Sequence, residues 1–329
     1  MNNLNIPNKI LDWYDNNKRN LPWRKKLPMR QREFSILISE FMLQQTQVKT
    51  VIPFFNSFIK KIPNLKSLSS VNDKDLLKCW EGLGYYSRAH NLKKTAIKVM
   101  NEYKGRLPKT IEELKTLPGI GDYTSKAIMS IVFNKKVIPL DGNVERILKR
   151  TLYLKKENQL SKEFLNSKIN YFGLSSRASD LTQAIMELGA LVCKPQKPTC
   201  KLCPLQENCL ANKKKDFEIK KIRKVNKIKY FEAIICKSKN NYLLIKNDKF
   251  NFLKNMPIFP MTEVNKEKYN SSTNKKINIK LSNIDMKIVL SNKRHLSEFK
   301  NQVILKSSNL QTEILPSFTK KIFRSIPKH

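Results

Sequence analysis

Four of the six cysteines of the chain crowd into one short stretch with the spacing C-x6-C-x2-C-x5-C. They are Cys193, Cys200, Cys203 and Cys209. Four thiolates so spaced can enclose Zn²⁺ or a [4Fe–4S] cluster. Zinc sites usually use two close C-x2-C pairs, and only one is present, so the spacing favours the cluster. Clustering also indicates a metal site in a reducing compartment rather than disulfides. Cys79 and Cys236 stand alone, and we expect ordinary buried thiols.

Two carboxylates stand in apolar surroundings. Asp141 interrupts the apolar run Ile138–Val144, and its simplest interpretation is a helix N-cap. Glu40 lies in the strongly apolar segment Ile36–Leu43, so it is either on an exposed stripe or held where its pKa is raised. A glutamic acid with a raised pKa can deliver a proton, and an ionised aspartate can stabilise a positively charged sugar. Cleavage of a glycosidic bond needs two carboxylates in these two roles, which gives the pair a chemical reason beside the simpler interpretations.

The string Leu117-Pro118-Gly119-Ile120-Gly121 lies between two predicted helices, at about 110–116 and 122–133. Glycine at both positions permits a tight turn with positive φ and leaves backbone N–H groups bare. N–H groups at the start of the second helix favour an anion such as a DNA phosphate. Proline–glycine turns between helices are often only turns, which is the alternative interpretation.

Helical periodicity dominates the first two thirds of the chain. Residues 4–18 predict one amphipathic helix, and the pattern from 23 to about 210 is helical almost throughout, with no long strands. We expect prolines to separate the helices, namely Pro53, Pro63, Pro108, Pro118 and Pro139.

After Cys209 the composition changes. Residues 211–229 are rich in lysine and arginine and predict a solvated linker, with a clamp along the DNA backbone as the alternative. Short β-like runs follow at 230–236, 242–245, 286–290 and 303–305, around a polar middle at 263–280. A smaller α+β domain over 230–329 is therefore expected.

The formal charge of +37 indicates a nucleic-acid partner, although a Lys-, Asn- and Ile-rich composition also follows from drift of the genome toward A and T. No uncharged apolar run approaches the ~18 residues of a membrane span, and the N-terminus lacks a secretory pattern. We expect a cytoplasmic protein.

Several longer strings join these features. They are Leu21-Pro22-Trp23, Ser39 to Val48, Gly82 to Arg88, the 117–121 hairpin, Leu140 to Val144, and Met186 to Ala190 leading into Cys193. With them the chain resembles the MutY-type adenine DNA glycosylases, within the endonuclease III-like helix-hairpin-helix, iron–sulfur superfamily, over nearly its whole length.

The resemblance implies a mainly α catalytic region followed by a smaller α+β, Nudix-like C-terminal domain. The helical region, 1–210, would comprise a six-helix domain at about 22–133 and a cluster domain from 1–21 and 134–210. Residues 211–229 would be the linker and 230–329 the lesion-recognition domain. One [4Fe–4S] cluster on the four cysteines, duplex DNA with A:8-oxoguanine or A:G mispairs as partner, and a monomeric state are implied as well.

The resemblance also implies roles for single residues. Glu40 is similar to the acid that protonates N7 of a flipped adenine, and Asp141 to the carboxylate that stabilises or bonds the sugar, with Asn143 and Tyr123 beside it. Arg24 and Glu187 resemble residues of the adenine pocket. Gln45 and Tyr85 resemble the wedges that fill the gap after base flipping, with core packing as the alternative for Tyr85 and Tyr86. Gly119 and Gly121 belong to the hairpin.

Tyr123 separates the closest relatives. Bifunctional lyases carry a Schiff-base lysine two residues after the final glycine of the hairpin, where this chain has Tyr123. A monofunctional glycosylase is therefore expected, and Lys126 is the residue that would support a lyase. The alternatives are an endonuclease III-like glycosylase/lyase and a DNA-binding iron–sulfur protein without turnover.

The chain departs from the family pattern in three places. The segment between Trp23 and Glu40 is a few residues longer than usual, which bears on the assignment of Arg24. Asp122 puts a negative charge beside the expected phosphate site. The family reads 8-oxoguanine with a Phe-Ser-His loop, for which this chain offers Leu296-Ser297-Glu298, so Ser297 is the expected lesion contact. The Nudix pyrophosphatase signature is absent, and no nucleotide hydrolysis is expected.

Overall fold

The computed structural model describes residues 5–218, 227–239, 241–281, 284–292, 302–306 and 315–326. Its contacts divide the chain into two compact units: Met1–Asn72 with Arg88–Lys221, and Asp73–Ser87 with Ile222–His329. Each unit is described by itself. Among the described residues, no helix is long and apolar enough to cross a membrane.

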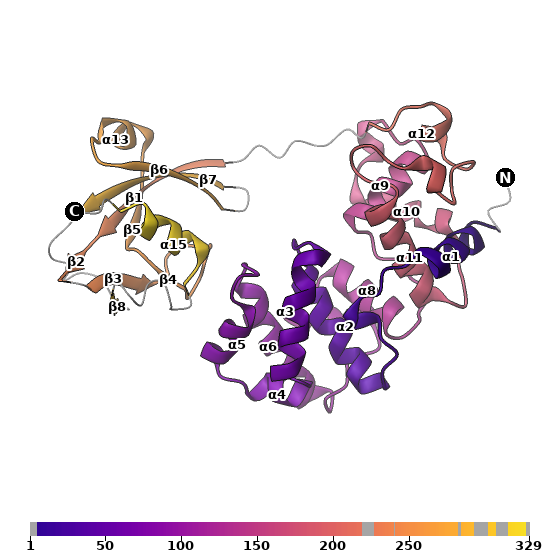
Figure 1. The fold of residues 1–329 in the computed structure, drawn as a ribbon, viewed down its shortest axis with the longest axis horizontal. Coiled ribbons are helices and arrows are strands. Elements are labelled where there is room, and N and C mark those ends of the chain that lie inside the picture. Colours follow the sequence, from indigo (N-terminus) through magenta and orange to yellow (C-terminus); the bar gives the residue numbers. More distant parts are fainter. Residues whose placement is uncertain are drawn as a thin grey trace. The chain divides into compact units, whose positions relative to one another are not determined.

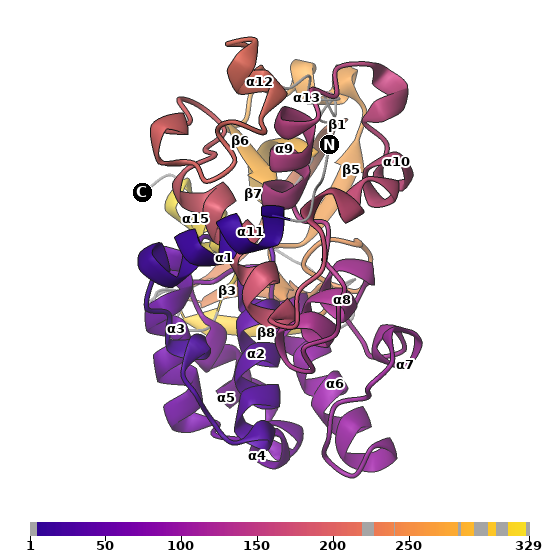
Figure 2. The ribbon, with the colours of Figure 1, turned by 90° about the vertical axis from the view of Figure 1, so that its right-hand side faces the viewer.

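The first unit is helical (Figure 1, Figure 2). Its helices are α1 Ile6–Asn17, α2 Met29–Leu43, α3 Val48–Lys61, α4 Leu65–Ser70, α6 Ser87–Glu102, α7 Ile111–Lys115, α8 Asp122–Ile131, α9 Gly142–Thr151, α10 Lys162–Ser167, α11 Ala178–Leu191 and α12 Leu210–Lys213. Short 3-10 turns join them at Pro22–Arg24, Glu157–Gln159, Ile169–Phe172 and Cys200–Leu202. The expected helix at 4–18 is confirmed as α1, and the expected turn between helices lies between α7 and α8.

The N-terminal helix belongs with the second half of this unit. Its apolar face, including Ile10 and Leu11, shares one buried cluster with α9 and α11, where Leu148 and Ile185 lie. Both sides are largely inaccessible to water, so burial of apolar area holds α1 against helices more than 120 residues later in the chain. This cluster is the support on which α9 and α11 carry their polar residues.

The prediction that Pro53 separates two helices is wrong, because Pro53 lies inside α3. It stands in the second turn of the helix, where its missing N–H removes a single intrahelical bond. The buried face of α3, with Val51, Phe55 and Phe58, packs into the core and outweighs that loss.

The C-terminal part carries the strands (Figure 1). They are β1 Lys227–Ile235, β2 Lys237–Ser238, β3 Asn241–Lys246, β4 Pro257–Ile258, β5 Met261–Val264, β6 Lys276–Leu281, β7 Ile284–Asn292 and β8 Gln302–Lys306. One sheet has the order β5-β1-β7-β6 with β1 and β7 parallel, and in the other β3 pairs β2, β4 and β8. The helices are α13 Lys266–Ser271 and α15 Ser317–Arg324, and α5 Asp73–Trp80 falls in the same unit.

The strand predictions at 230–236, 242–245, 286–290 and 303–305 are confirmed by β1, β3, β7 and β8. The polar middle at 263–280 is more regular than its composition indicates, since it holds the end of β5, all of α13 and most of β6. In β6, Ile279 is buried between the exposed residues Asn278 and Lys280, so the alternation is present but rests on few apolar positions.

The predicted linker, 211–229, is too long at both ends. Residues up to 218 lie on the helical unit: Ala211 is buried, and Asp216 accepts from the Tyr153 hydroxyl at 2.7 Å and from Lys155 Nζ at 3.0 Å. Residues 227–229 begin β1. These contacts were not predicted because the segment is rich in lysine, and lysine stems and single acids can pack against a domain without forming an apolar pattern in the sequence.

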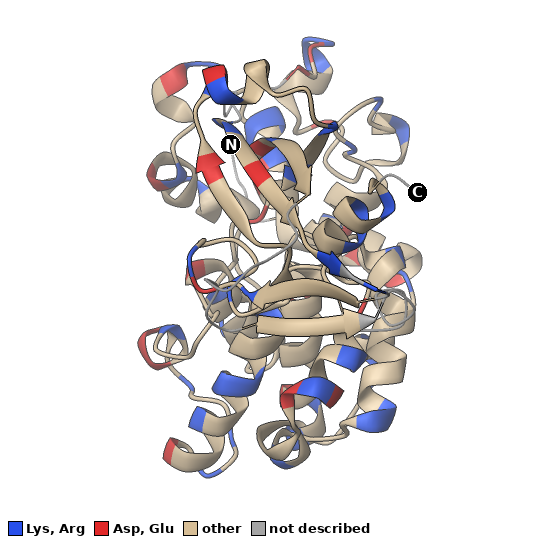
Figure 3. Cartoon of the chain, turned by 90° about the vertical axis from the view of Figure 1, so that its left-hand side faces the viewer, with Lys and Arg blue, Asp and Glu red and all other residues tan. Residues whose placement is uncertain are grey.

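Basic side chains are not gathered on one element. In the view of Figure 3, lysines and arginines are spread over helices and strands, with acids fewer and interspersed. Charge alone therefore does not locate a DNA-binding surface, and the site must be built from particular residues.

Candidate functional site: two buried carboxylates and a four-cysteine pocket

Glu40 lies on α2 at a position that water hardly reaches, with 6% of its surface exposed. Burial and, after it, the charge of Asp141 raise the pKa of Glu40, a hydrogen bond from Tyr123 lowers it, and the net effect is a rise from 4.5 to about 7. The interpretation of Glu40 as an exposed surface residue is therefore wrong. This carboxyl holds a proton close to neutral pH and can release it there.

Tyr123 stands in the first turn of α8 and is the partner of Glu40. Burial, followed by the nearby charges of Glu40 and Asp141, holds the pKa of its phenol well above 10. The hydroxyl consequently keeps its proton and acts as a donor to the carboxylate. α2 and α8 thus contribute one member each to a coupled pair.

Asp141 caps the N-terminus of α9, so the capping interpretation is confirmed. Its Oδ1 accepts from the backbone N–H groups of Asn143 at 2.9 Å and Val144 at 2.7 Å, and its Oδ2 accepts from Asn143 Nδ2 at 2.9 Å. Burial raises the pKa of the carboxyl, and these hydrogen bonds offset part of the rise. Capping does not exclude chemistry, since the charge of Asp141 acts directly on Glu40.

Asn143 is held on two sides. A Cβ placed on Gly189 of α11 would lie 2.5 Å from the Asn143 Cβ, so the two helices approach closely only because residue 189 is glycine. Arg146 Nη2 donates to Asn143 Oδ1 and to the Gly189 carbonyl, both at 2.7 Å, and Nε donates to the Cys193 carbonyl at 2.6 Å. Sequence reasoning missed Arg146. Its place three residues after Asn143, on the same face of α9, was the available signal.

A second buried acid, Glu187 on α11, is 1% exposed and receives two arginines. Arg19 Nε and Nη2 lie 2.7 Å from its two oxygens, and Arg24 Nη1 lies 3.0 Å from one of them. Burial raises the pKa of Glu187, but the two guanidinium groups outweigh it and the net pKa is lowered. The structure brings Arg24 and Glu187 together and adds Arg19, which sequence reasoning missed, while the assignment of Arg24 and Glu187 to an adenine pocket stays a prediction.

The hairpin glycines differ from each other. Gly119 has φ +83°, and an added Cβ would lie 2.8 Å from a Phe41 ring atom, so this position requires glycine. The expectation of positive φ at Gly121 is wrong: its φ is −99°, and an added Cβ would meet nothing within 4 Å. Gly121 leaves the N-terminus of α8 without a side-chain cap. Asp122, next in the chain, pairs with Lys126 Nζ at 2.9 Å, which offsets its charge.

The two predicted wedges share an uncommon backbone. Gln45 has φ +56° and Tyr85 has φ +48°, a region that costs non-glycine residues conformational energy. Tyr85 is 44% exposed and Tyr86 only 6%, so the core-packing alternative holds for Tyr86 alone. Gln45 and Tyr85 fall in different units. The predicted lesion contact, Ser297, lies outside the described residues.

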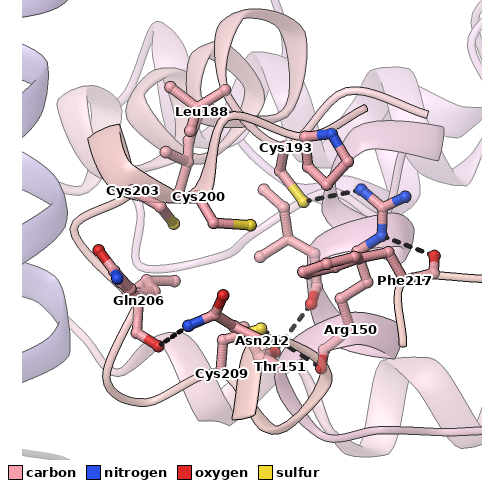
Figure 4. Close-up of a pocket in the computed structure, with 14 residues that line it drawn as sticks. Arg150, Thr151, Leu188, Cys193, Cys200, Cys203, Gln206, Cys209, Asn212 and Phe217 are labelled. Atoms are coloured by element: carbon pink, nitrogen blue, oxygen red, sulfur yellow. Dashed lines mark hydrogen bonds between the residues drawn. The ribbon is translucent and has the colours of Figure 1, made fainter. Parts of the chain in front are cut away.

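The four cysteines point into one hollow between α9 and the loop after α11 (Figure 4). The hollow measures about 400 Å³ with its open mouth, and Ile147, Leu188 and Leu205 supply apolar walls. Burial raises the pKa of the Cys203 thiol to about 12 and also raises those of Cys200 and Cys209, and the charges of neighbouring thiols add to this. Cys79 and Cys236 are half-buried rather than buried, which corrects the expectation for them.

The donor set of this hollow consists of four thiols beside a buried arginine. In the described part of the chain, no three His, Cys, Asp or Glu side chains surround a single ion position, yet four thiols line a common hollow. Arg150, 4% exposed, places Nη1 3.4 Å from Cys193 Sγ and binds the carbonyls of Lys194 and Pro195 at 2.6 and 2.8 Å. Soft thiolates, apolar walls and a buried cation suit an anionic iron–sulfur group.

The fold and the coupled acids define a class of DNA repair protein. The family model of the HhH-GPD superfamily base excision DNA repair proteins matches residues 38–170, which include Glu40, the hairpin and Asp141. A solved structure of a thermostable thymine-DNA glycosylase superposes with a TM-score of 0.57 and 26% identity, covering 64% of this chain and 97% of that one. The predicted helical glycosylase fold is confirmed.

The relatives narrow the class. The chain is 37% identical to the adenine DNA glycosylase of Buchnera aphidicola subsp. Schizaphis graminum (strain Sg) over 259 residues, covering 76% of this chain and 73% of that protein. It is 34% identical to the adenine DNA glycosylase of Buchnera aphidicola subsp. Baizongia pistaciae (strain Bp) over 341 residues, covering 97% and 96%. The chain belongs to the adenine DNA glycosylase family.

Proposed function

We propose that the chain hydrolyses the N-glycosidic bond of adenine mispaired with 8-oxoguanine or guanine in duplex DNA, as a monomer, in the compartment that holds the DNA. Family membership supports base excision of adenine. The observation that carries the chemistry is Glu40: its pKa of about 7 makes it an acid at the pH of the cell, beside Asp141. Such a pair matches the demands of glycoside cleavage.

In the proposed reaction Glu40 donates its proton to N7 of the flipped adenine. The bond between C1′ of the sugar and N9 of the base then breaks, and its electron pair leaves with the base. The carboxylate of Asp141 stabilises the resulting sugar cation or bonds to it, and water completes the exchange at C1′. A proton from that water restores Glu40. Tyr123 holds the carboxylate of Glu40 through its hydroxyl, and Asn143 orients Asp141.

The remaining residues are assigned to binding. Arg19, Arg24 and Glu187 form a rigid ionic cluster that we assign to the adenine pocket. The bare N-terminus of α8 at Gly121 suits a phosphate, since backbone N–H groups and the helix dipole favour anions. Gln45 and Tyr85 are assigned to the gap left by base flipping, and Ser297 to the base opposite the adenine.

Cys193, Cys200, Cys203 and Cys209 are assigned as ligands of one [4Fe–4S] cluster. When bound, the cluster would supply a structural cross-link of the loop from Cys193 to Cys209. Arg150 and Arg146 hold this loop against α9, and Arg146 also touches Asn143, so the order of the loop bears on the site of the acids.

A monofunctional reaction is favoured over the lyase alternative. The first turn of α8 offers the Tyr123 phenol to the acids, and Lys126 is engaged with Asp122 at 2.9 Å. Borohydride trapping on duplexes with oxidised pyrimidines discriminates between the two. Efficient trapping that disappears in Lys126→Ala would favour the lyase.

The central test compares single-turnover base release from A:8-oxoguanine, A:G and A:C duplexes, with alkali used to cleave the abasic product. We expect cutting of the adenine strand by the wild-type protein and loss of cutting in Glu40→Gln. Tight binding with no release from any duplex would instead support a DNA-binding iron–sulfur protein without turnover.

A further inference from the structure

The C-terminus of α2 is closed by a cation from another helix. The last carbonyls of a helix lack intrahelical partners, and α2 has no basic residue in its own last turn. Arg88, 7% exposed in the first turn of α6, places Nη1 3.1, 2.9 and 2.5 Å from the carbonyl oxygens of Phe41, Met42 and Gln44. A buried guanidinium at the negative end of the helix dipole therefore fixes where α2 ends.

The chain turns immediately after this closure. Gln45 adopts φ +56° and exposes its side chain, and Thr46 ties the turn back through N–H to the Leu43 carbonyl at 3.1 Å and through Oγ1 to the Gln44 carbonyl at 3.3 Å. A residue in this costly backbone region keeps its geometry only when the surroundings impose it. Arg88 is the charged member of those surroundings, because it binds the carbonyl of Gln44, next to Gln45.

The same face of α6 also holds the hairpin. Arg88, Asn91 and Thr95 are spaced i, i+3 and i+7, which aligns them on one side of the helix. Thr95 Oγ1 donates to the Pro118 carbonyl at 2.7 Å, and Asn91 packs where a Cβ on Gly119 would clash at 2.9 Å.

The two segments are also joined directly, since Gln44 Nε2 donates to the Gly119 carbonyl at 3.3 Å. One face of α6 thus sets the distance between the Gln45 turn and the hairpin.

We propose that Arg88 is a positioning residue for base flipping. It fixes the Gln45 turn at a set spacing from the phosphate-binding hairpin, so that the hairpin binds the DNA backbone while Gln45 inserts into the duplex. This rests on the proposed function, in which Gln45 fills the gap left by the adenine. Base flipping costs unstacking and unpairing energy, and an inserted side chain offsets this cost only if it is positioned to fill the gap in the duplex. A loosened turn would leave Gln45 present and its insertion unfavourable.

The test is a double-mutant cycle between Arg88→Met and Gln45→Gly, with two readouts on an adenine mispair. One is the single-turnover rate of adenine release. The other is the fluorescence of 2-aminopurine placed beside the target adenine, which reports unstacking without chemistry. Arg32→Met is the matched control, because Arg32 Nη2 binds the Ile131 carbonyl at the end of α8, 2.7 Å away, and touches neither DNA-facing segment.

We expect Arg88→Met to lower the single-turnover rate by about tenfold to one-hundredfold, the size expected when hydrogen bonds from a charged donor are lost, and to reduce the 2-aminopurine signal in the same direction. Arg88→Lys should restore part of the loss, and in the Gln45→Gly background either change should cost less than about twofold. Arg32→Met should leave both readouts unchanged. Equal losses in the two backgrounds would overturn the proposal.

If Arg88→Met does not fold, the cycle is run with Arg88→Lys, and additive losses there overturn the proposal in the same way. A wild-type protein that unstacks the adenine without releasing it would refute the proposed function while the fluorescence still tests Arg88. Absence of both signals in the wild type would refute both.

Discussion

Replacing Glu40 by glutamine should make the protein more stable, and the gain should grow with pH. The fold favours the neutral form of Glu40, because burial, followed by the charge of Asp141, raises its pKa from 4.5 to about 7. Below pH 4.5 the carboxyl is protonated in both folded and unfolded chains, so no cost arises. Between the two pKa values the folded chain binds more protons than the unfolded one, so stability falls as pH rises. Above about 7 the full cost is present.

The size of the cost follows from the pKa values. Each pKa unit corresponds to ~1.4 kcal/mol, so the difference between 4.5 and about 7 amounts to about 3 kcal/mol. Glutamine has nearly the same shape and no charge to lose. The free energy of unfolding of Glu40→Gln should therefore exceed that of the wild type by about 3 kcal/mol at pH 8 and converge with it toward pH 4.5.

Urea unfolding of both proteins at several pH values between 5 and 8 measures this difference. Glu33 on the same helix is the matched control. It is 1% exposed as well, but Arg106 binds it at 2.6 and 3.0 Å. Glu33→Gln should destabilise the protein at each of these pH values by about 1–3 kcal/mol, because it weakens the charged hydrogen bonds to the half-exposed Arg106. A difference between Glu40→Gln and wild type that does not change with pH would refute the reasoning about Glu40.

Three further outcomes are expected. Single-turnover adenine release should fall as pH rises through about 7. In the wild type the hydrogen bond from Tyr123 lowers the pKa of Glu40, so Tyr123→Phe should raise that pKa and move the fall in rate to higher pH; a shift of the fall to lower pH would contradict this. Gly119→Ala should lower the free energy of unfolding by about 2 kcal/mol through its positive φ and close contacts, whereas Gly121→Ala should change it by less than about 1 kcal/mol and weaken duplex binding in a fluorescence titration; equal stability losses would refute the distinction. Cys203→Ser should lower both the iron content of the purified protein and its thermal midpoint, and unchanged iron would exclude Cys203 as a ligand.

The sequence was most informative about residues whose type suggests a chemical role, such as Glu40 and Asp141. Glu40 within an apolar helix and Asp141 before a helix were each open to a simpler interpretation, and only their proximity shows that one charge acts on the other. Sequence spacing cannot supply that proximity, because α2, α8 and α9 meet through tertiary packing. Tyr123 was predicted from its place after the hairpin, yet its hydrogen bond to Glu40 required the fold.

Sequence reasoning missed the arginines that support the site, and the reasons are similar. Arg19 and Arg150 bind a buried acid and carbonyls of distant segments, which no local pattern displays, and Arg146 offered only its i, i+3 spacing to Asn143. In a chain with 64 lysines and arginines a single functional arginine does not stand out by composition. The position of Pro53 was predicted wrongly for the opposite reason. The tendency of proline to end helices is strong, but burial of the apolar face of α3 outweighs it.

The two carboxylate oxygens of Asp141, which caps α9, have different hydrogen-bond partners. Oδ1 of Asp141 takes both backbone N–H groups, at 2.9 and 2.7 Å, whereas Oδ2 takes a single side-chain donor from Asn143. An oxygen with two short backbone bonds is tied to the helix, and the other keeps lone-pair capacity. In the role proposed for Asp141, the sugar would therefore meet Oδ2 alone, and α9 would stay capped from the first contact to the release of the abasic product. The fixed end of the helix and the reactive atom are then neighbours on one carboxylate, and neither function interrupts the other.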